Sequence, residues 1–520
     1  MVTEEQLLRQ FFANPGEVIE SIFTIEDKYG SVVPFHLTRI QRDYLSRRTG
    51  RDTSLKPRQV KVSSIILACN TVGLVTSNNI NCLITTDAPT VTQNFRLRLK
   101  RHFDDLRKVG LPITYEIDNE DHLRLKEYGN SIFFTEAGST GVGRGLTFGL
   151  VHMSEVAFWK TQSITPGQAI AGILASVPPQ YGHVDIESTP FGASGAFYRL
   201  VQAAQQGGNE FRLHFWPWWW EEDYRSSRPA DPPFNAMEQA LMQAHGLDLF
   251  QIQFRRETIN RMRPTGTPFE QEYPEDPETC FLAGEANFLP ADIIIRLRSR
   301  VIPSIESVGP YVRIYKKCDP TRTYIAGVDA AEGIVTSLTA DAHACQILDA
   351  RTMEQVCVIH GILPLSEFAD LCYEYLNRYN TAFTGVEVPG PGVAIIDRLE
   401  QRRYPNLYWH PRDENNPATS ESWRAGWPAT AHNNVIALSQ LFTALDGGNI
   451  IIYDADTVSQ LAAMRWMRPK QRRANRFARA EAAPGEHDDL VFALRVAHQI
   501  APYVPVPTDQ RPRSEGVGVW

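Results

Sequence analysis

The chain has 520 residues, of which 43% are hydrophobic, so it is long enough to bury at least two domain cores, because domains usually span roughly 100–250 residues. Its formal net charge of −8 at pH 7 excludes a protein that coats nucleic acid with its whole surface, and any DNA contact should come from local basic patches. The seven cysteines contain no Cys-x-x-Cys spacing, no apolar run approaches the ~20 residues that span a bilayer, and the N-terminus lacks a signal-peptide pattern, so we expect a soluble intracellular protein with neither a zinc site nor a disulfide framework.

The first segment with a chemical signature lies between residues 34 and 68. An apolar-flanked stretch ends at Gln41, and residues 55–64 then read Leu-Lys-Pro-Arg-Gln-Val-Lys-Val-Ser-Ser before an apolar run. A phosphate loop uses glycines for close backbone approach, a lysine for the terminal phosphates and a serine or threonine for Mg²⁺. Here Lys61 stands in the place of the last glycine and Val62 in that of the lysine, while Ser63 keeps the hydroxyl. Taken alone, the segment matches a phosphate loop only in part.

Two later strand candidates end in polar residues. The apolar run 146–153 leads into Ser154 and Glu155, and a carboxylate at such a strand end can hold Mg²⁺ or polarise an attacking water. The run 184–187 leads into Ser188 and Thr189, a polar pair placed to sense a phosphate. Strand, loop, helix and two further polar-ended strands in this order predict an open parallel sheet that binds its ligand at the strand ends.

Acidic residues follow or open three apolar segments of the second half. Asp329 follows residues 324–328, Glu387 follows residues 383–386, and Asp488 and Asp489 open a helical pattern at residues 490–494. Carboxylates suit hard divalent cations, and two such cations would activate water and stabilise the leaving oxygen in phosphodiester cleavage. Any one of these acids alone is better explained as a strand-end or helix-cap residue.

A basic stretch directly precedes the last acidic pair. It contains Arg465, Arg468, Lys470, Arg472, Arg473, Arg476 and Arg479 and no acid. Side chains of this kind contact nucleic-acid phosphates without reading sequence, and the alternative is a solvated basic loop. Gly- and Pro-containing sequence between about 284 and 320 indicates a domain junction.

In their order along the chain these motifs resemble those of the large terminase subunits of tailed bacteriophages, the motors that package and cut viral DNA. The resemblance covers almost the whole chain. Its landmarks are residues 56–63, Gly143-Arg144-Gly145, residues 152–159, Glu187-Ser188-Thr189-Pro190, Gly327-Val328-Asp329, Gly385-Val386-Glu387 and residues 487–494. It implies an α/β protein in which an additional-strand ATPase domain of the P-loop class, with a parallel sheet, spans residues 1–300 and a ribonuclease-H-like α/β nuclease domain spans 310–500, before a flexible tail at 501–520.

The resemblance also implies residue roles. Gln41 would meet the adenine of ATP, Lys56 the phosphates and Ser63 the Mg²⁺ ion. Glu155 would activate the attacking water, Ser188 and Thr189 would couple hydrolysis to movement, and Arg144 is the candidate arginine finger. Arg58, Gln59, Lys61 and Ser64 complete the expected nucleotide contacts. Asp329, Glu387 and one or both of Asp488 and Asp489 would hold two Mg²⁺ or Mn²⁺ ions in the nuclease.

Two departures from the family pattern concern the ATPase. Lys61 replaces a usual glycine, where its bulk could obstruct the phosphates or its charge could contribute to binding. Ser154 replaces an aspartate before Glu155, which removes a carboxylate near Mg²⁺. We therefore expect weak or partner-dependent ATPase activity.

The implied function is to translocate double-stranded DNA into a procapsid with the energy of ATP and to cut it. The implied partners are the capsid portal protein, the small terminase subunit and further copies of this chain in a ring, a pentamer by resemblance, at the portal in the host cytoplasm. One alternative is a metal-dependent nuclease with a degenerate, non-hydrolysing nucleotide module. Another is a non-catalytic protein that docks DNA to a capsid vertex, which the acids at all three nuclease positions disfavour.

Overall fold

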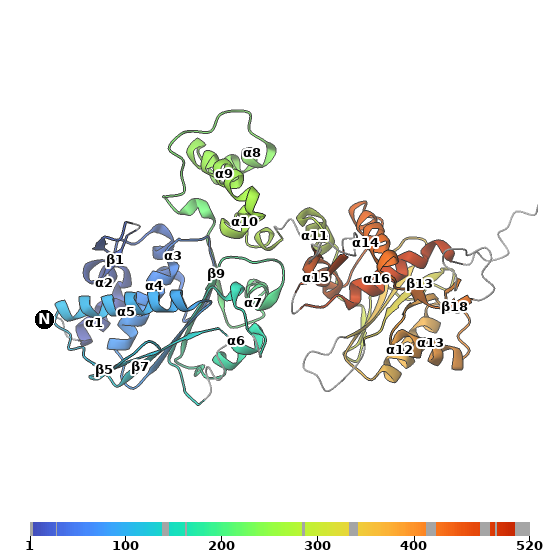
Figure 1. Cartoon of the computed structure of the whole chain (residues 1–520), viewed down its shortest axis with the longest axis horizontal. Helices are drawn as coiled ribbons and strands as arrows, with labels where there is room; N and C mark the ends of the chain where they lie inside the picture. The colour runs from blue at the N-terminus through green and yellow to red at the C-terminus, as the bar shows by residue number, and fades with distance from the viewer. Residues whose placement is uncertain are drawn as a thin grey trace, which may run out of the picture. The chain divides into compact units, whose positions relative to one another are not determined.

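The chain divides into two compact units, residues 1–285 and 286–520, in the computed structural model (Figure 1). The structure describes residues 4–27, 29–137, 145–161, 164–282, 287–331, 342–411, 423–467, 479–483 and 486–504. Across these ranges, no helix has both the length and the apolar character that crossing a membrane requires.

In the sheet of the first unit, one strand is inserted between the strand that precedes the candidate phosphate loop and the strand that precedes Glu155. Its order is β10-β3-β9-β8-β4-β7-β6-β5. The strands are β3 (Arg51–Leu55), β4 (Asn81–Thr86), β5 (Tyr115–Asp118), β6 (His122–Leu125), β7 (Asn130–Glu136), β8 (Leu150–Ser154), β9 (His183–Ser188) and β10 (Arg212–Phe215). The pairs from β10 to β7 are parallel, and β9 separates β3 from β8. This is the additional-strand parallel sheet that the sequence predicted.

Helices cover both faces of this sheet. α4 (Val62–Val75) and α5 (Pro89–Lys108) pack on one face, and α6 (Pro166–Leu174) and α7 (Gly195–Gln205) on the other (Figure 1). The cause is topological: the connections through α4 and α5 run one way along the sheet and those through α6 and α7 run the other, and parallel crossovers are right-handed. α4 is buried on nearly all sides, so the residues at its start are held rigidly.

Smaller elements complete the first unit. They are α1 (Glu4–Ala13), α2 (Pro15–Ile22), β1 (Thr24–Glu26), β2 (Val32–Pro34), α3 (Arg39–Arg47), η1 (Val156–Phe158), η2 (Trp218–Trp220), α8 (Ala236–His245), α9 (Leu249–Met262), η3 (Arg263–Thr265), α10 (Phe269–Glu272) and η4 (Thr279–Phe281). The helices α8 to α10 surround a separate apolar cluster centred on Trp218, which is fully buried against Phe254 and Phe269.

The second unit contains a mixed seven-stranded sheet in the order β11-β12-β15-β14-β13-β16-β19. The strands are β11 (Glu306–Val308), β12 (Val312–Ile314), β13 (Tyr324–Asp329), β14 (His343–Asp349), β15 (Gln355–Gly361), β16 (Phe383–Val388) and β19 (Trp427–Pro428). β15, β14 and β13 are antiparallel neighbours, and β13, β16 and β19 are parallel neighbours. Three antiparallel strands followed by two parallel ones form the ribonuclease-H-like arrangement that the sequence predicted.

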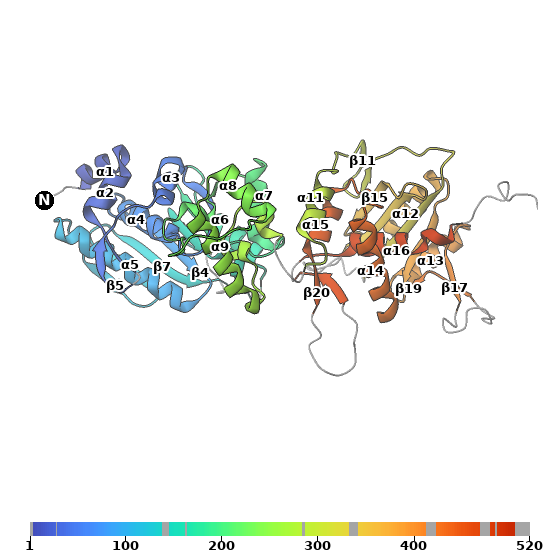
Figure 2. The ribbon, with the colours of Figure 1, turned by 90° about the horizontal axis from the view of Figure 1, so that it is seen from above.

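Helices pack on both faces of the second sheet as well. α12 (Leu365–Arg378) and α13 (Gly392–Gln401) lie on one face, and α14 (Ala431–Asp446), α15 (Ala455–Ala463) and α16 (Asp489–Ile500) on the other (Figure 1). The remaining elements are α11 (Ala291–Arg298), β17 (Trp409–Pro411), β18 (Trp423–Ala425), β20 (Met464–Met467), β21 (Arg479–Ala482) and η6 (Ala501–Tyr503). β20 and β21 form an antiparallel pair apart from the main sheet (Figure 2).

Two glycines allow α16 to approach this sheet closely. Gly327 lies two residues before Asp329, and Gly385 two residues before Glu387, so each glycine shares a sheet face with the acid that follows it. A Cβ atom on Gly327 would overlap the carbonyl oxygen of Ala493 and the amide nitrogen of Ala497 in α16. The repeated Gly-Val-acid motif therefore brings the sheet against the helix that begins with the acidic pair.

We predict that Gly327→Ala destabilises the second unit by about 3 kcal/mol or more, because backbone atoms of α16 cannot yield as side chains do. Gly385→Ala is the matched comparison, since its Cβ would meet only side chains, 2.9 Å from Val496 Cγ1 and 3.0 Å from Ile500 Cγ2, and should cost about 1–2 kcal/mol. Denaturant unfolding of the second unit measures both, and equal losses would contradict the stated role of Gly327.

Candidate nucleotide and metal sites

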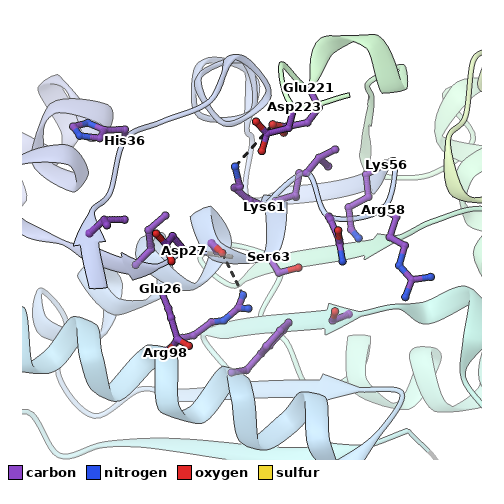
Figure 3. A pocket seen from close by; sticks show the side chains of 18 of the residues that line it. Glu26, Asp27, His36, Lys56, Arg58, Lys61, Ser63, Arg98, Glu221 and Asp223 are labelled. Atoms are coloured by element: carbon purple, nitrogen blue, oxygen red, sulfur yellow. Dashed lines mark hydrogen bonds and ion pairs between the residues drawn. The ribbon is translucent and has the colours of Figure 1, made fainter. Parts of the chain in front are cut away.

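A cavity of about 1020 Å³ opens at the carboxyl ends of β3 and β8, in the first unit. The loop after β3, the start of α4, Ser154 and Glu155 line it, together with parts of β1 and α5 and the segment from Glu221 to Tyr224 (Figure 3). Ligands of open parallel sheets bind at this edge. The cavity therefore lies where the sequence placed its nucleotide site.

The loop between β3 and α4 has the backbone form of an anion-binding turn. Gln59 and Lys61 adopt left-handed conformations, with φ of 57° and 61°, which a non-glycine residue seldom occupies. Lys61 is the N-cap residue of α4, and its side chain makes no capping hydrogen bond. The Lys61 side chain therefore does not occupy the first amides of α4, which are the groups that bind phosphate at helix N-termini.

Gln41 supports this loop from outside the cavity. Its side-chain amide donates to the carbonyl oxygen of Lys61 over 2.8 Å, and its oxygen accepts from the backbone N–H of Thr38. The side chain is fully buried and is not part of the cavity lining. In this structure both ends of the Gln41 side chain bind protein, whereas the sequence prediction assigned it to adenine.

Lys56 lies between two carboxylates at the centre of the site. Its ammonium is 2.8 Å from Glu155 Oε1 and 3.0 Å from Glu187 Oε2, and its side chain is 5% exposed. Burial alone lowers the pKa of the Lys56 ammonium, but Glu155 and Glu187 outweigh it and hold that pKa above its usual range. Lys56 is therefore charged and placed to meet an anion that enters the loop.

Glu187 is the residue that the sequence analysis quoted but left without a role. Burial raises the pKa of Glu187, yet the Lys56 ammonium, with hydrogen bonds from His152 and Ser63, reverses this and holds the pKa below its usual range. Ser63 Oγ donates to Glu187 Oε1 over 2.5 Å, and Ser154 Oγ donates to the same oxygen over 2.8 Å. The available signal was an acid beside the Ser-Thr pair, at the end of a strand next to Ser154.

Glu155 has a strained backbone, with a φ of 51° directly after β8. Its Oε2 is 3.4 Å from both the Ser188 hydroxyl and the Thr189 amide, so the two strand ends meet at this carboxylate. Non-glycine residues in the left-handed region cost about 1–3 kcal/mol and concentrate at functional sites. The structure thus brings Lys56, Ser63, Glu155, Ser188 and Thr189 together.

Three of the remaining nucleotide candidates, Lys61, Arg58 and Ser64, line the same cavity and contact side chains of other segments. Lys61 extends toward Glu221, with its ammonium 3.9 Å from that carboxylate (Figure 3). Arg58 pairs with Glu272 at 3.1 Å, and the Ser64 hydroxyl accepts a hydrogen bond from Arg98 over 3.3 Å. Arg144 lies outside the described residues. As a donor set for Mg²⁺, the hydroxyl of Ser63 and the nearby carboxylates fit a hard cation.

In the second unit, Asp329 and Glu387 end two neighbouring strands. The preceding residues Val328 and Val386 are paired in the parallel register. Burial raises the pKa of Asp329 well above its usual value, the carboxylates of Glu387, Asp489 and Asp488 raise it further, and Arg495 opposes them. The other three acids predicted from the sequence therefore all lie close enough to Asp329 to raise its pKa.

The acidic pair at the start of α16 has two distinct surroundings. Asp488 is the N-cap residue of α16, but its side chain makes no capping hydrogen bond and accepts one from the Ala482 amide over 3.0 Å. Asp489 is 6% exposed, and its Oδ2 makes no hydrogen bond within the described part of the chain. Imidazole nitrogens of His360 and His487 lie 3.8 and 3.9 Å from that oxygen. A buried carboxylate oxygen without a donor fits a cation ligand better than a helix cap.

Arg495, which the sequence analysis did not single out, holds Glu387. Its guanidinium is ion-paired with Glu387 Oε2, and it stacks 4.3 Å from the ring centroid of Phe492 and 5.1 Å from that of Trp427. Over the described residues, no three His, Cys, Asp or Glu side chains are grouped so as to hold a metal ion. The carboxylates are suitable ligands for divalent cations, but the Arg495 guanidinium already compensates the charge of Glu387.

Of the basic stretch before α16, residues 468–478 lie outside the described residues. Arg465, its first member, donates to the backbone carbonyls of Ala462 and Met464.

No protein-family model matches the sequence. Among solved structures, the chain is similar to the large terminase of bacteriophage HK97, with 11% identity and a TM-score of 0.47 over 96% of this chain and 99% of that one. It is similar to the large terminase of a thermophilic bacteriophage in complex with ADP, with 12% identity and a TM-score of 0.32 over 89% and 98%. It is also similar to the magnesium-bound large terminase nuclease of the thermophilic phage G20c, with 17% identity and a TM-score of 0.33 over 42% of this chain and 98% of that one.

Proposed function

We propose that this chain is a terminase large subunit, which hydrolyses ATP to move double-stranded DNA into a procapsid and cuts that DNA with a metal-dependent nuclease. The observation that carries the proposal is the meeting of Lys56, Ser63, Glu155 and Glu187 at the carboxyl ends of the strands of an additional-strand sheet. The juxtaposed acids of the ribonuclease-H-like unit support the second activity.

For ATP hydrolysis, residues of this chain bind the phosphates, and the Glu155 carboxylate accepts a proton. The start of α4 presents backbone amides, and Lys56 offers three N–H donors for which phosphate oxygens compete with Glu155 and Glu187. A phosphate that draws the ammonium away frees Glu155 to orient and deprotonate a water. Bound Mg²⁺, held through Ser63, would neutralise charge on the phosphates.

In the nuclease, Asp329, Glu387 and Asp489 would hold the divalent ions, and Asp488 would support them. Two Mg²⁺ or Mn²⁺ ions would supply an activated water and stabilise the leaving oxygen. The chain contributes carboxylates from two strand ends and one helix start, which are fixed relative to one another by the close approach of α16 to β13.

The partners follow from the same proposal. They are double-stranded DNA, the capsid portal protein, the small terminase subunit and further copies of this chain in a ring at the procapsid, in the host cytoplasm. With a formal net charge of −8, the chain should contact DNA through restricted basic surfaces. Such binding should therefore weaken as salt is raised.

The second candidate is a nuclease whose nucleotide module binds but does not hydrolyse. The ion pair between Lys56 and Glu155 favours it, because both groups are occupied by each other, and so does Ser154 in place of a carboxylate. ATP turnover by the full chain with DNA and portal protein present separates the two, since turnover above the protein-free rate excludes the second.

Glu155→Gln should retain ATP binding but lower the hydrolysis rate by roughly 100- to 10,000-fold, the usual worth of a general base. Glu221→Gln removes another carboxylate from the same cavity, on the side of Lys61, and should keep most of the rate. Single-turnover hydrolysis is the measurement. A normal rate in Glu155→Gln would remove Glu155 from the mechanism.

Asp329→Ala should abolish metal-dependent cleavage of plasmid DNA, because deleting one carboxylate leaves the cations without a shared ligand. Asp349→Asn is the matched control and should retain cleavage. Asp349 ends the neighbouring strand β14 and pairs with Tyr324, at the other end of β13 from Asp329. Cleavage is followed on gels with Mg²⁺ or Mn²⁺. Undiminished cutting by folded Asp329→Ala protein would refute this assignment.

Lys61→Gly should retain or improve ATP binding, because glycine adopts the left-handed conformation at this position without strain. Lys56→Ala should weaken binding by about 1.5–3 kcal/mol, the worth of a charge-assisted contact. Titration calorimetry compares the two. Loss of binding in Lys61→Gly, with normal binding in Lys56→Ala, would make Lys61 the phosphate lysine.

A further inference from the structure

The inserted strand β9 places the carboxylate of Glu187 beside Ser154, the residue that stands where an acid is usual. β9 pairs with both neighbours, and Glu187 stands in register with Ser54 on β3 and with Ser154 on β8. Nucleotide sheets of this kind usually place an acid before the catalytic glutamate, where it acts with the loop hydroxyl on Mg²⁺. In this chain that place holds a hydroxyl, and the acid lies on the adjacent strand.

The contacts of Glu187 are directed at the nucleotide loop. Its side chain is completely buried, and Oε1 receives hydrogen bonds from Ser63 and Ser154, with His152 Nε2 at 3.3 Å. Oε2 is paired with the Lys56 ammonium at 3.0 Å. A buried carboxylate is costly unless it is paired and hydrogen-bonded, and two of the groups that pair with Glu187 belong to the phosphate loop itself.

We propose that Glu187 is the positioning residue for the magnesium ion of the nucleotide site, acting through Ser63 from β9 in place of the acid that Ser154 lacks. This inference rests on the nucleotide site proposed above. It assigns to the inserted strand a chemical role as well as its structural one.

The hydrogen-bond direction explains how Glu187 acts. A serine hydroxyl has one proton to donate and lone pairs to offer. Because Ser63 donates its proton to Glu187 Oε1, its lone pairs remain available to a cation on the other side of the oxygen. Ser154, which donates to the same oxygen, fixes the carboxylate in this orientation. A glutamine at position 187 keeps the shape of the side chain and removes the charge.

The test measures how much Mg²⁺ strengthens nucleotide binding in the full chain. A non-hydrolysable ATP analogue is titrated calorimetrically in EDTA and in excess Mg²⁺, and the ratio of the two dissociation constants is the Mg²⁺ gain. In Glu187→Gln, binding in EDTA should be equal or tighter, because a negative charge near the phosphates is gone. The Mg²⁺ gain should fall roughly 10- to 100-fold, as for other groups that orient a metal ligand.

Two further variants separate this role from general damage. Ser154→Asp combined with Glu187→Gln returns a carboxylate to β8 and should restore most of the Mg²⁺ gain. Glu221→Gln removes another buried acid, one that lines the cavity beside Lys61, and should leave the gain unchanged. If Glu187→Gln does not fold, Glu187→Asp keeps the charge, withdraws the carboxylate from Ser63 by one methylene and must lower the gain.

A full Mg²⁺ gain in folded Glu187→Gln or Glu187→Asp overturns the inference. So does an equal loss of affinity with and without Mg²⁺, which would make Glu187 a structural support alone. A wild-type chain that binds no nucleotide in either condition would instead overturn the proposed ATP site.

Discussion

The proposed nucleotide site depends on one charge arrangement, in which the Lys56 ammonium is shared by Glu155 and Glu187. Charges removed from water are stable only while they are paired, and loss of one partner leaves the other uncompensated. The three residues come from the ends of β3, β8 and β9, so the pairing also fixes the relative positions of these strand ends. The ion pairs hold the three strand ends together, and the sheet in turn keeps the three charged groups in contact, so the cavity keeps its form.

The second unit also brings carboxylates together, but it does so by close packing of a helix against the sheet. Its acids are brought together by a helix that approaches the sheet through Gly327 and Gly385, where side chains are absent. Burial, and then repulsion from Glu387, Asp489 and Asp488, raise the pKa of Asp329 above its usual value. Arg495 provides a counter-charge to Glu387 and is itself held between aromatic rings. Any cation that binds Glu387 must therefore compete with a guanidinium that is already desolvated.

Much of the fold was accessible from the sequence, because buried parallel strands appear as short apolar runs that end in polar residues. The strands that end near Glu155, Ser188, Asp329 and Glu387 were predicted in this way, and both sheets have the topology that the family resemblance implied. These signals are local, since each depends on a few consecutive residues.

The missed features depend on contacts between distant segments. The contact of Glu187 with Ser154 arises from the register of β9 with β8, which no single segment encodes. The contact of Gln41 with the Lys61 carbonyl depends on how α3 packs, and the adenine role that the family resemblance implied for Gln41 stays a prediction. Arg495 gave a weak signal, a lone arginine in the otherwise apolar middle of α16, whose partner on β16 is 108 positions away in the chain.

The packing of α3 has a mechanical consequence. From one helix, Gln41 holds the carbonyl of Lys61 in the phosphate loop, and Tyr44, one turn later, donates to Asp185 on β9. α3 is thus a strut that spans two parts of the nucleotide site. The loop and the inserted strand cannot be displaced relative to each other without bending this strut or breaking one of its two attachments, so a load applied to either is carried by both.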